Sequence, residues 1–423
     1  MTLDTGVIAD DLTGGLLVAG FLEAEGIECP VVTGAGNVAA AAAGGPALVV
    51  ARRIRFASPT QAVAEFETAA GALVAAGARQ VYYKYCATFD STDDGNIGPC
   101  ADALMRLGGV DRLGFCPAFP GVGITVYQGH MFLRDQLLNE SPKRFDPLAP
   151  MPDPNLVRVL GRQTGRRVGL VARDILHQGD AVARAHIDAL VADGIPYLIF
   201  DAIDDADVAA CARLTADWPA MTGGDTLSHM APARRIAERR PPRGCLPVVA
   251  GLAAVISGSC GAATLTQLER FEAYRPVRRI ALIEAAADPA AAVAEALTWA
   301  ESRLADGPVA LAVSDHPAGV AQAQATLGRD GAGRLGEELC ADLAVGLYGL
   351  GVRRFAVAGG ETSGAVAAAL GIGRLDVAVH GPLGGGLCHA DAPAPMSLLF
   401  KAGKMGPPEI FLRTFATMGA DDV

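Results

Sequence analysis

Short apolar runs alternate along the chain with longer alanine-rich stretches of helical character. In the first half, an apolar run at 5–9 precedes a helical stretch at 14–26, and another at 46–51 precedes one at 58–77. Further apolar runs are QVYYKYCATF, DRLGFCPAF, VGLVARDIL, GIPYLIFDAI and WPAMTGGD. This order predicts an α/β fold with mainly parallel strands.

A polar segment interrupts the pattern near the middle of the chain. Residues 237–247, AERRPPRGCLP, bring together four charges and two consecutive prolines, which favours an exposed connection. Beyond it the alternation resumes, with helices expected at 264–274 and near 335–351. We predict two domains, 1–240 and 241–423, each with a mainly parallel sheet flanked by helices, and a ligand cleft between them.

Charge and cysteine usage narrow the class of partner. The net charge of −11 argues against a nucleic acid or an anionic membrane, because either would be repelled at long range. The nine cysteines lack CxxC spacing, which indicates reduced thiols and argues against a zinc site. With no leader-like start and no apolar run of about 18 residues, we expect a cytoplasmic protein. A homodimer stays open.

Charged residues follow the strands predicted in the first domain. Asp10 and Asp11 come directly after the first apolar run, and could bind hydroxyls, act as a general base, hold a metal or simply cap a helix. Arg53 and Arg55 follow the second run and supply positive charge suited to a carboxylate, unless they form a solvated edge. Lys84 is unusual within a strand unless it is paired or reaches into a site.

Glycine-rich turns follow the strands predicted in the second domain. They are Ser257 to Cys260, Ala358 to Gly364 and Lys401 to Gly406. Small residues let backbone amides approach phosphate oxygens, and a following helix adds its positive end. One such turn is usually only a turn, but three at successive strand ends indicate a nucleotide. The turns match neither GxGxxG nor GxxxxGK[ST], which argues against a dehydrogenase. His130 and His389 are the two histidines placed for a site, although a lone histidine is more often structural.

Taken together, these motifs resemble the four-carbon acid sugar kinase family, in order and over nearly the whole chain. The motifs are IADDLTG, KYCATFDST, GNIGP, PAFPGVGITVYQGH, LLNESP, SGSC, AGGETSG and KAGKMG. The resemblance implies that the first domain holds a sugar acid, that the second holds ATP with Mg²⁺, and that a phosphoryl group passes to a terminal hydroxyl. Asp10 or Asp11 would serve as the base, and Glu361 could assist the metal.

The family's binding residues carry over to named positions. The implied substrate-binding residues are Arg53, Arg55, Lys84, Asp90, Ser91, Gly223, Gly224 and Asp225, beside Asp10 and Asp11. The implied ATP-binding residues are Ser257, Ser259, Gly359, Gly360, Glu361, Thr362, Gly403 and Gly406.

Two departures from the family pattern stand out. The family's Ala-Thr-Asp stretch is here Gly15-Leu16-Leu17, which bears on the choice of substrate, and Lys404 adds a cation to the last glycine-rich turn, which could favour phosphate. The expected substrate is 3-oxo-tetronate, phosphorylated at its terminal carbon, within the branch of the family that the motifs resemble. The alternatives are 3-oxo-isoapionate or another branched acid, D-threonate, and a non-catalytic sensor of sugar acids or nucleotides.

Overall fold

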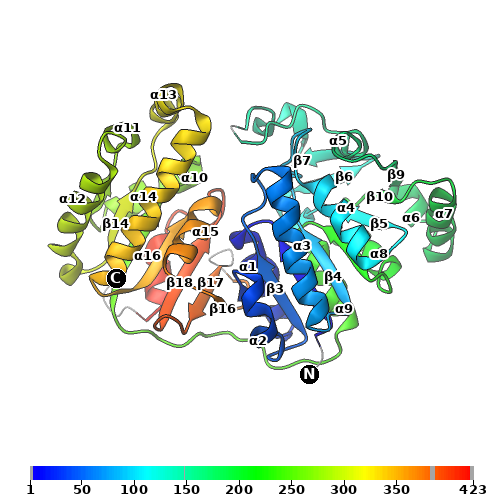
Figure 1. Ribbon diagram of the computed structural model, residues 1–423, viewed down its shortest axis with the longest axis horizontal. Helices are drawn as coiled ribbons and strands as arrows, with labels where there is room; N and C mark the ends of the chain where they lie inside the picture. Colours follow the sequence, from blue (N-terminus) through cyan, green and yellow to red (C-terminus); the bar gives the residue numbers. More distant parts are fainter. Residues whose placement is uncertain (1–2, 147, 382–385, 420–423) are drawn as a thin grey trace. The chain divides into compact units, whose positions relative to one another are not determined.

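The computed structural model describes residues 3–146, 148–381 and 386–419, and the chain divides into two compact units (Figure 1). The first unit is Met1–Pro242 and the second is Arg243–Val423. Outside helices and strands, most of the residues from 237 to 248 are exposed, as a polar connection should be.

The first unit is built on a parallel sheet. Its strands, in spatial order, are β2 (Val31–Val32), β3 (Ala47–Ala51), β1 (Thr5–Ala9), β4 (Gln80–Lys84), β11 (Ala220–Gly223), β5 (Leu113–Cys116), β10 (Tyr197–Phe200) and β9 (Val168–Val171). The central strands are buried along their whole length, because helices cover both faces of a parallel sheet.

Several helices of this unit begin at a side-chain cap. They are α1 (Leu12–Ala24), α2 (Val38–Ala42), α3 (Pro59–Ala75), α4 (Ile97–Gly108), α5 (Leu156–Gln163), α6 (Arg173–Leu176), α7 (Asp180–Ala192), α8 (Asp205–Leu214) and α9 (Asp225–Arg235). Asp11 caps α1, Asp204 caps α8, and Ser58 caps α3 with Pro59 as its first residue.

A small antiparallel sheet interrupts the helix-and-strand alternation. It contains β6 (Ile124–Tyr127), β7 (His130–Leu133) and β8 (Gln136–Leu137), joined by short turns. Two 3₁₀ turns, Leu138–Glu140 and Pro142–Phe145, follow it. The apolar pattern did not predict this sheet, because its strands are short and only partly buried.

The second unit has a mixed sheet. Its strands, in spatial order, are β13 (Val277–Arg279), β14 (Val309–Ala312), β12 (Leu252–Ser257), β15 (Val352–Ala358), β18 (Met396–Lys401), β17 (Leu387–Ala390) and β16 (Arg374–Val377). The neighbouring strands from β13 to β18 in this order are parallel to one another. β17 pairs antiparallel with both β18 and β16.

Helices cover this second sheet (Figure 1). They are α10 (Ala262–Glu272), α11 (Leu282–Ala285), α12 (Pro289–Glu301), α13 (Pro317–Leu327), α14 (Arg329–Gly349), α15 (Gly360–Ala369) and α16 (Ile410–Thr417). Phe271 of α10 and Phe411 of α16 pack with Val255 and Leu399 in one buried cluster. The prediction of an α/β fold with mostly parallel strands is therefore confirmed.

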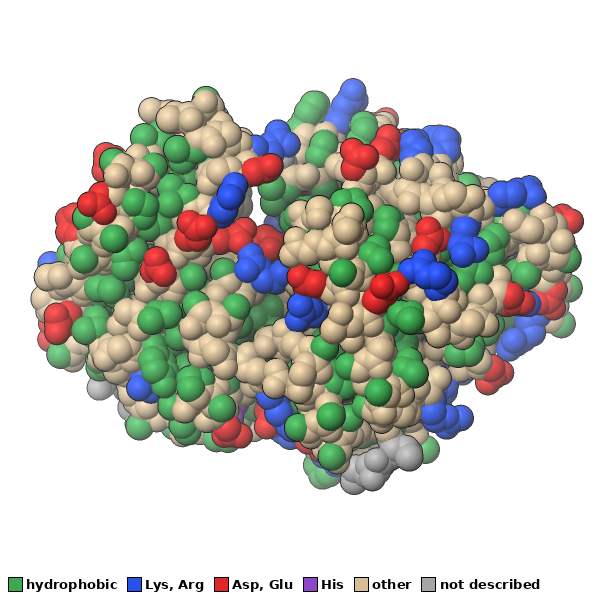
Figure 2. All heavy atoms as spheres, in the orientation of Figure 1, with side chains coloured by type: hydrophobic (Ala, Val, Ile, Leu, Met, Phe, Trp, Pro, Cys, Tyr) green, Lys and Arg blue, Asp and Glu red, His purple; other side chains and the backbone are tan. Residues whose placement is uncertain are grey.

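The surface carries side chains of both charges. On the face shown in Figure 2, basic and acidic side chains are interspersed. Among the described residues, no helix combines the length and apolar character needed to cross a membrane.

Candidate active site

The carboxyl ends of four parallel strands meet at one edge of the first unit. Ala9 of β1 pairs with Ala51 of β3 and with Lys84 of β4, and Lys84 pairs with Gly223 of β11. The residues that follow these strands therefore lie side by side, where α/β proteins bind their ligands. This register brings together charged residues that are far apart in the sequence.

An arginine joins the two adjacent aspartates. Arg55 donates from Nε and Nη2 to the two carboxylate oxygens of Asp10, at 2.8 and 2.9 Å, and Nη2 lies 3.0 Å from Oδ2 of Asp11. Asp11 also caps α1 by accepting from the Gly14 amide at 2.7 Å. Burial alone would raise the pKa of Asp11, but Arg55 and Lys84 outweigh it and lower that pKa. A substrate carboxylate would have to share Arg55 with these aspartates.

Lys84 forms a buried ion pair with Asp225. Its Nζ lies 3.2 Å from Oδ1 of Asp225, and both side chains are almost fully buried. A Cβ at Gly14 would collide with that Nζ, so glycine makes room for the lysine. Burial raises the pKa of Asp225, opposed by Lys84. Burial opposes protonation of Lys84, but Asp225, Asp10 and Asp11 outweigh it and raise its pKa.

Asp90 is held by Lys143, which the sequence analysis missed. Nζ of Lys143 lies 2.7 Å from Oδ1 of Asp90 and 2.7 Å from Oδ2 of Asp146. Thr88 donates to Asp90 at 2.6 Å. Burial would raise the pKa of Asp90, but Lys143 and Arg55 lower it. The only sequence signal was a lysine directly after the LLNESP motif.

Other predicted substrate residues have structural contacts. Ser91 is buried and its hydroxyl accepts from Nε2 of Gln163 at 2.8 Å. The Gly223 carbonyl accepts from the Tyr85 amide at 3.2 Å, and a Cβ at Gly224 would collide with the Pro117 carbonyl. Arg53 is exposed.

Asn96 holds the loop that carries Arg55. Its Nδ2 donates to the carbonyls of Ile54, Arg55 and Ala57 at 2.7, 3.2 and 2.8 Å. Asn96 of the GNIGP motif therefore helps to position the Arg55 guanidinium. A local sequence pattern could not indicate this role.

The departure at Gly15-Leu16-Leu17 lies mostly in the core. A Cβ at Gly15 would stand 3.0 Å from Val49 of β3, and Leu16 is fully buried. Leu17 alone is partly exposed. Of the three positions, Leu17 is thus the one with surface left for a ligand.

Four parallel strand ends also meet in the second unit. Ser257 of β12 pairs with Ala312 of β14 and with Ala358 of β15, and Ala358 pairs with Lys401 of β18. The Gly359 amide donates to the Lys401 carbonyl at 2.9 Å, which ties two of the turns together. The three glycine-rich turns are therefore neighbours.

The glycines of these turns allow close backbone packing. Gly359 has φ +125°, and its Cβ would stand 2.6 Å from Oγ1 of Thr362. A Cβ at Gly258 would meet that same hydroxyl, and one at Gly403 would meet Oγ of Ser259. α15 begins at Gly360 and α10 just after Gly261, so the positive ends of two helices are at this edge.

Hydroxyl groups line these turns. Oγ of Ser257 lies 2.7 Å from Oγ of Ser314, and Oγ of Ser259 lies 3.2 Å from Oγ1 of Thr264. Gly406 has φ +90° and packs on Ile410, and Glu361 lies in the first turn of α15. The arrangement is suited to a phosphate chain bound by amides and hydroxyls.

Lys401 is a further residue that the sequence analysis quoted but did not assign. It is 3% exposed, and its Nζ donates to Oγ1 of Thr264 at 3.0 Å. Burial lowers its pKa to about 7. Its position at the end of β18 puts a cationic side chain beneath the glycine-rich turns.

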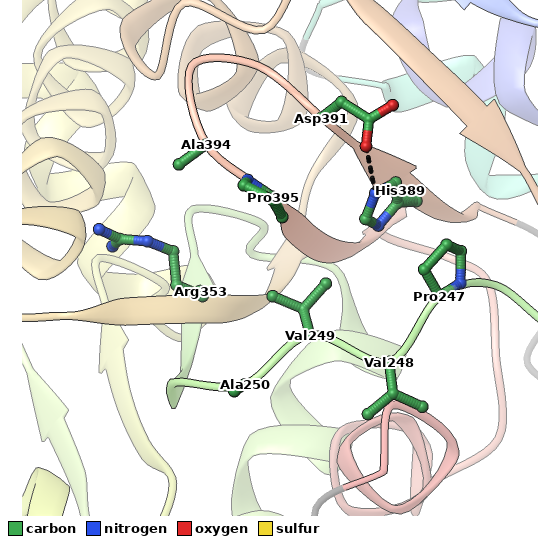
Figure 3. Close-up of a pocket in the computed structure, with 9 residues that line it drawn as sticks. All are labelled: Pro247, Val248, Val249, Ala250, Arg353, His389, Asp391, Ala394 and Pro395. Carbon is green, nitrogen blue, oxygen red and sulfur yellow. Dashed lines mark hydrogen bonds and ion pairs between the residues drawn. The ribbon is translucent and has the colours of Figure 1, made fainter.

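A pocket of about 440 Å³ lies at the opposite ends of the same strands (Figure 3). It is lined by Arg353 near the start of β15 and by residues just before β12 and β18, including Ala250 and Pro395. Nε2 of His389 lies 2.9 Å from Oδ1 of Asp391 at its rim.

The other histidine that the sequence analysis singled out, His130, lies in the small sheet of the first unit. Its Nδ1 is 2.7 Å from the Gln128 carbonyl oxygen.

Two family models divide the chain as the two units do. The "Sugar-binding N-terminal domain" matches residues 5–230, and the "Nucleotide-binding C-terminal domain" matches residues 254–411. The chain is 42% identical over 410 residues to a Burkholderia multivorans protein named 3-oxo-tetronate kinase, covering 96% of this chain and 95% of that one. It is 40% identical over 433 residues to one of the same name from Methylobacterium radiotolerans, covering 99% and 100%.

A solved structure gives the same picture of the fold. A Salmonella typhimurium protein, provisionally named a tRNA synthase, matches with a TM-score of 0.81 and 32% identity, covering 97% of this chain and 98% of that one. The two family models match successive parts of the chain, and each of the two relatives matches over nearly its whole length. The chain therefore belongs to the four-carbon acid sugar kinase family.

Proposed function

We propose that this protein is an ATP-dependent kinase that phosphorylates the terminal hydroxyl of 3-oxo-tetronate, giving 3-oxo-tetronate 4-phosphate. The observation that carries the proposal is that each unit has a candidate site at the ends of its parallel strands. The site of the first unit is a charged cluster, and the site of the second unit consists of three neighbouring glycine-rich turns. The full-length similarity to two proteins named 3-oxo-tetronate kinase supports this substrate.

The acid sugar is assigned to the cluster in the first unit. Arg55 and Lys84 supply the positive charge for its carboxylate, and Asp90 and Asp225 accept from its hydroxyls. The remaining proposed contacts are Arg53, Ser91, Gly223 and Gly224. Asp10 or Asp11 accepts the proton of the reacting hydroxyl as the new P–O bond forms. Arg55 holds both carboxylates in place for this step.

ATP is assigned to the turns in the second unit. The amides of Gly360 and Gly403 surround the phosphates, Gly359 lets the backbone of its turn approach them closely, and the hydroxyls of Ser257 and Thr362 lie beside them. Ser259 and Gly406 complete the neighbouring turns.

Mg²⁺ fits this site as an ion carried by the nucleotide. Within the described part of the chain, no three His, Cys, Asp or Glu side chains form a metal cluster. Mg²⁺ commonly takes one or two carboxylates together with substrate phosphates, and Glu361 is the proposed protein ligand. When bound, it neutralises phosphate charge.

Transfer requires the two ligands to meet in a cleft between the domains. Phosphoryl transfer depends mainly on positioning and on neutralising charge, and it must exclude water from the γ-phosphate. We therefore propose that the domains close over the bound ligands.

The reaction is tested by ADP release with a panel of acid sugars. The panel contains 3-oxo-tetronate, 3-oxo-isoapionate and D-threonate, and we expect the highest kcat/KM with the first. Preference for 3-oxo-isoapionate would assign a branched substrate, with Leu17 as the first residue to vary. Saturable binding without ADP release by any acid would instead favour a sensor.

The proposed base is tested by Asp10→Asn and Asp11→Asn. We expect at least one to lower kcat by roughly 100-fold or more while ADP binding is kept, because general base catalysis contributes about 10²–10⁴. Asp135→Asn, in the exposed turn between β7 and β8, is the matched control. Full turnover by both site variants would disprove the assignment.

A further inference from the structure

Lys401 differs from the other two buried lysines in what it faces. Lys84 and Lys143 each lie within 3.2 Å of a carboxylate oxygen. The Nζ of Lys401 donates to the Thr264 hydroxyl and lies 6.0 Å from the centre of the Phe411 ring. Among the described residues, no carboxylate oxygen lies within 4.0 Å of that nitrogen. The ammonium is therefore buried without a counter-charge.

The surroundings of this nitrogen belong to the glycine-rich turns. Thr264, which accepts from Lys401, donates to the Gly403 carbonyl at 2.9 Å and approaches Oγ of Ser259 at 3.2 Å. The backbone carbonyl of Lys401 accepts from the Gly359 amide. One lysine thus contacts, directly or through one hydroxyl, all three turns.

Burying an ammonium group without an anion is unfavourable. The charged form of Lys401 therefore destabilises the folded state unless a bound anion compensates for the lost hydration. The N-termini of α10 and α15 add positive potential at the same edge, which favours an anion there. A bound phosphate would supply the negative charge that the side chains around Lys401 lack.

We propose that Lys401 contacts a phosphate of the bound nucleotide and takes up one proton from solvent when the nucleotide binds. The inference rests on the proposed function only in naming the ligand as a nucleotide. The proton adds to the neutral amine of Nζ, and no other bond forms or breaks. The ammonium so formed pairs with a phosphate oxygen.

Burial alone accounts for the weak basicity of the free side chain, with a pKa of about 7. Thr264 of α10 and the Phe411 ring of α16 face it. The charged groups on adjoining elements include Glu361 on α15, Lys404 on the same turn, Glu269, Arg270 and Glu272 on α10, Glu409 before α16 and Arg413 on α16, and none of them is among the causes of the shift. At pH 8 the free side chain is mostly neutral, so binding should require a proton.

The test is calorimetric titration with ADP at pH 8 in two buffers of different ionisation enthalpy. The comparison is between wild type, Lys401→Met and the control Arg413→Met, which removes an exposed charge from α16. We expect wild type and Arg413→Met to take up about one proton more than Lys401→Met. We expect Lys401→Met to bind ADP roughly 10- to 100-fold more weakly, as for loss of one charge-assisted hydrogen bond.

A second variant, Lys401→Arg, tests proton uptake without removing the positive charge, because the arginine side chain stays charged in the free protein. It should bind ADP without the extra proton. Wild-type ADP affinity and proton uptake in folded Lys401→Met would overturn the inference, as would failure of the wild type to bind ADP. If wild type shows the linked proton but phosphorylates no acid sugar, the inference stands and the proposed reaction fails.

Discussion

At the scale of residues, the same side chain has different consequences according to what faces it. Lys84 and Lys143 are buried against carboxylates, and the favourable charge interactions raise their pKa values despite burial. Lys401 has no such partner in the described structure, and burial lowers its pKa. The first two lysines hold the charged cluster together, whereas the third retains a capacity to bind an anion.

The pH dependence of stability follows from Lys401. Its pKa is about 7 in the folded chain, against an ordinary value of 10.5, so the unfolded chain binds more protons between these values. The free energy of unfolding should therefore rise with pH from about 7 to about 10.5, and the penalty should be largest below pH 7.

Urea unfolding of wild type and Lys401→Met across pH 6.5 to 10 measures this effect. We expect the variant to be the more stable protein at pH 6.5, because methionine carries no charge to bury, and the difference to shrink as pH rises. A difference that stays constant with pH would show that the ammonium is not destabilising in the fold.

At the scale of elements, both ends of α15 have a glycine with positive φ, but the two differ in their neighbours. Gly359 precedes the helix with φ +125° and stands against Thr362, whereas Gly371 follows it with φ +66° and would leave a Cβ in open space. The first glycine is needed for close packing at the proposed phosphate site. The second mainly ends the helix.

Alanine at these two glycines separates binding from stability. Each variant should lose about 1–3 kcal/mol of unfolding free energy from backbone strain. Only Gly359→Ala should also weaken ADP binding, by tenfold or more, because its Cβ displaces Thr362. Calorimetric titration and urea unfolding of both variants check this, and equal ADP affinity would argue against a phosphate at this turn.

At the scale of the whole molecule, the sugar-acid residues and the nucleotide residues are assigned to separate units. Each unit builds its candidate site in the same way, from residues that follow adjacent parallel strands. A kinase of this organisation has to bring two independently formed sites together, which makes domain movement part of the proposed mechanism.

Small-angle scattering tests this movement. We expect the radius of gyration to fall when 3-oxo-tetronate and a non-hydrolysable ATP analogue are both bound, and to change less with either alone. Gly359→Ala, which should bind the analogue poorly, provides the control. Identical scattering with and without both ligands would count against closure.

Most of the fold was predictable from the sequence because parallel strands between two layers of helices are continuous apolar runs. The small antiparallel sheet was missed, since its half-exposed strands lack such runs. The candidate site was predictable where a residue ends a strand, as Lys84 does, or directly follows one, as Asp10 does. Lys143 and Asn96 were not assigned, because their contacts with Asp90 and the Arg55 loop depend on chain folding over long separations.

The sequence by itself determined the α/β class, the family and the residues that stand at strand ends, because these depend on local pattern and on ordered motifs. Only the tertiary structure decided which charges meet. Strand register places Arg55 between Asp10 and Asp11, pairs Lys84 with Asp225, and leaves Lys401 without a carboxylate among the described residues. The physical reason is that charge interactions and burial depend on distance in space, which the order of residues does not specify.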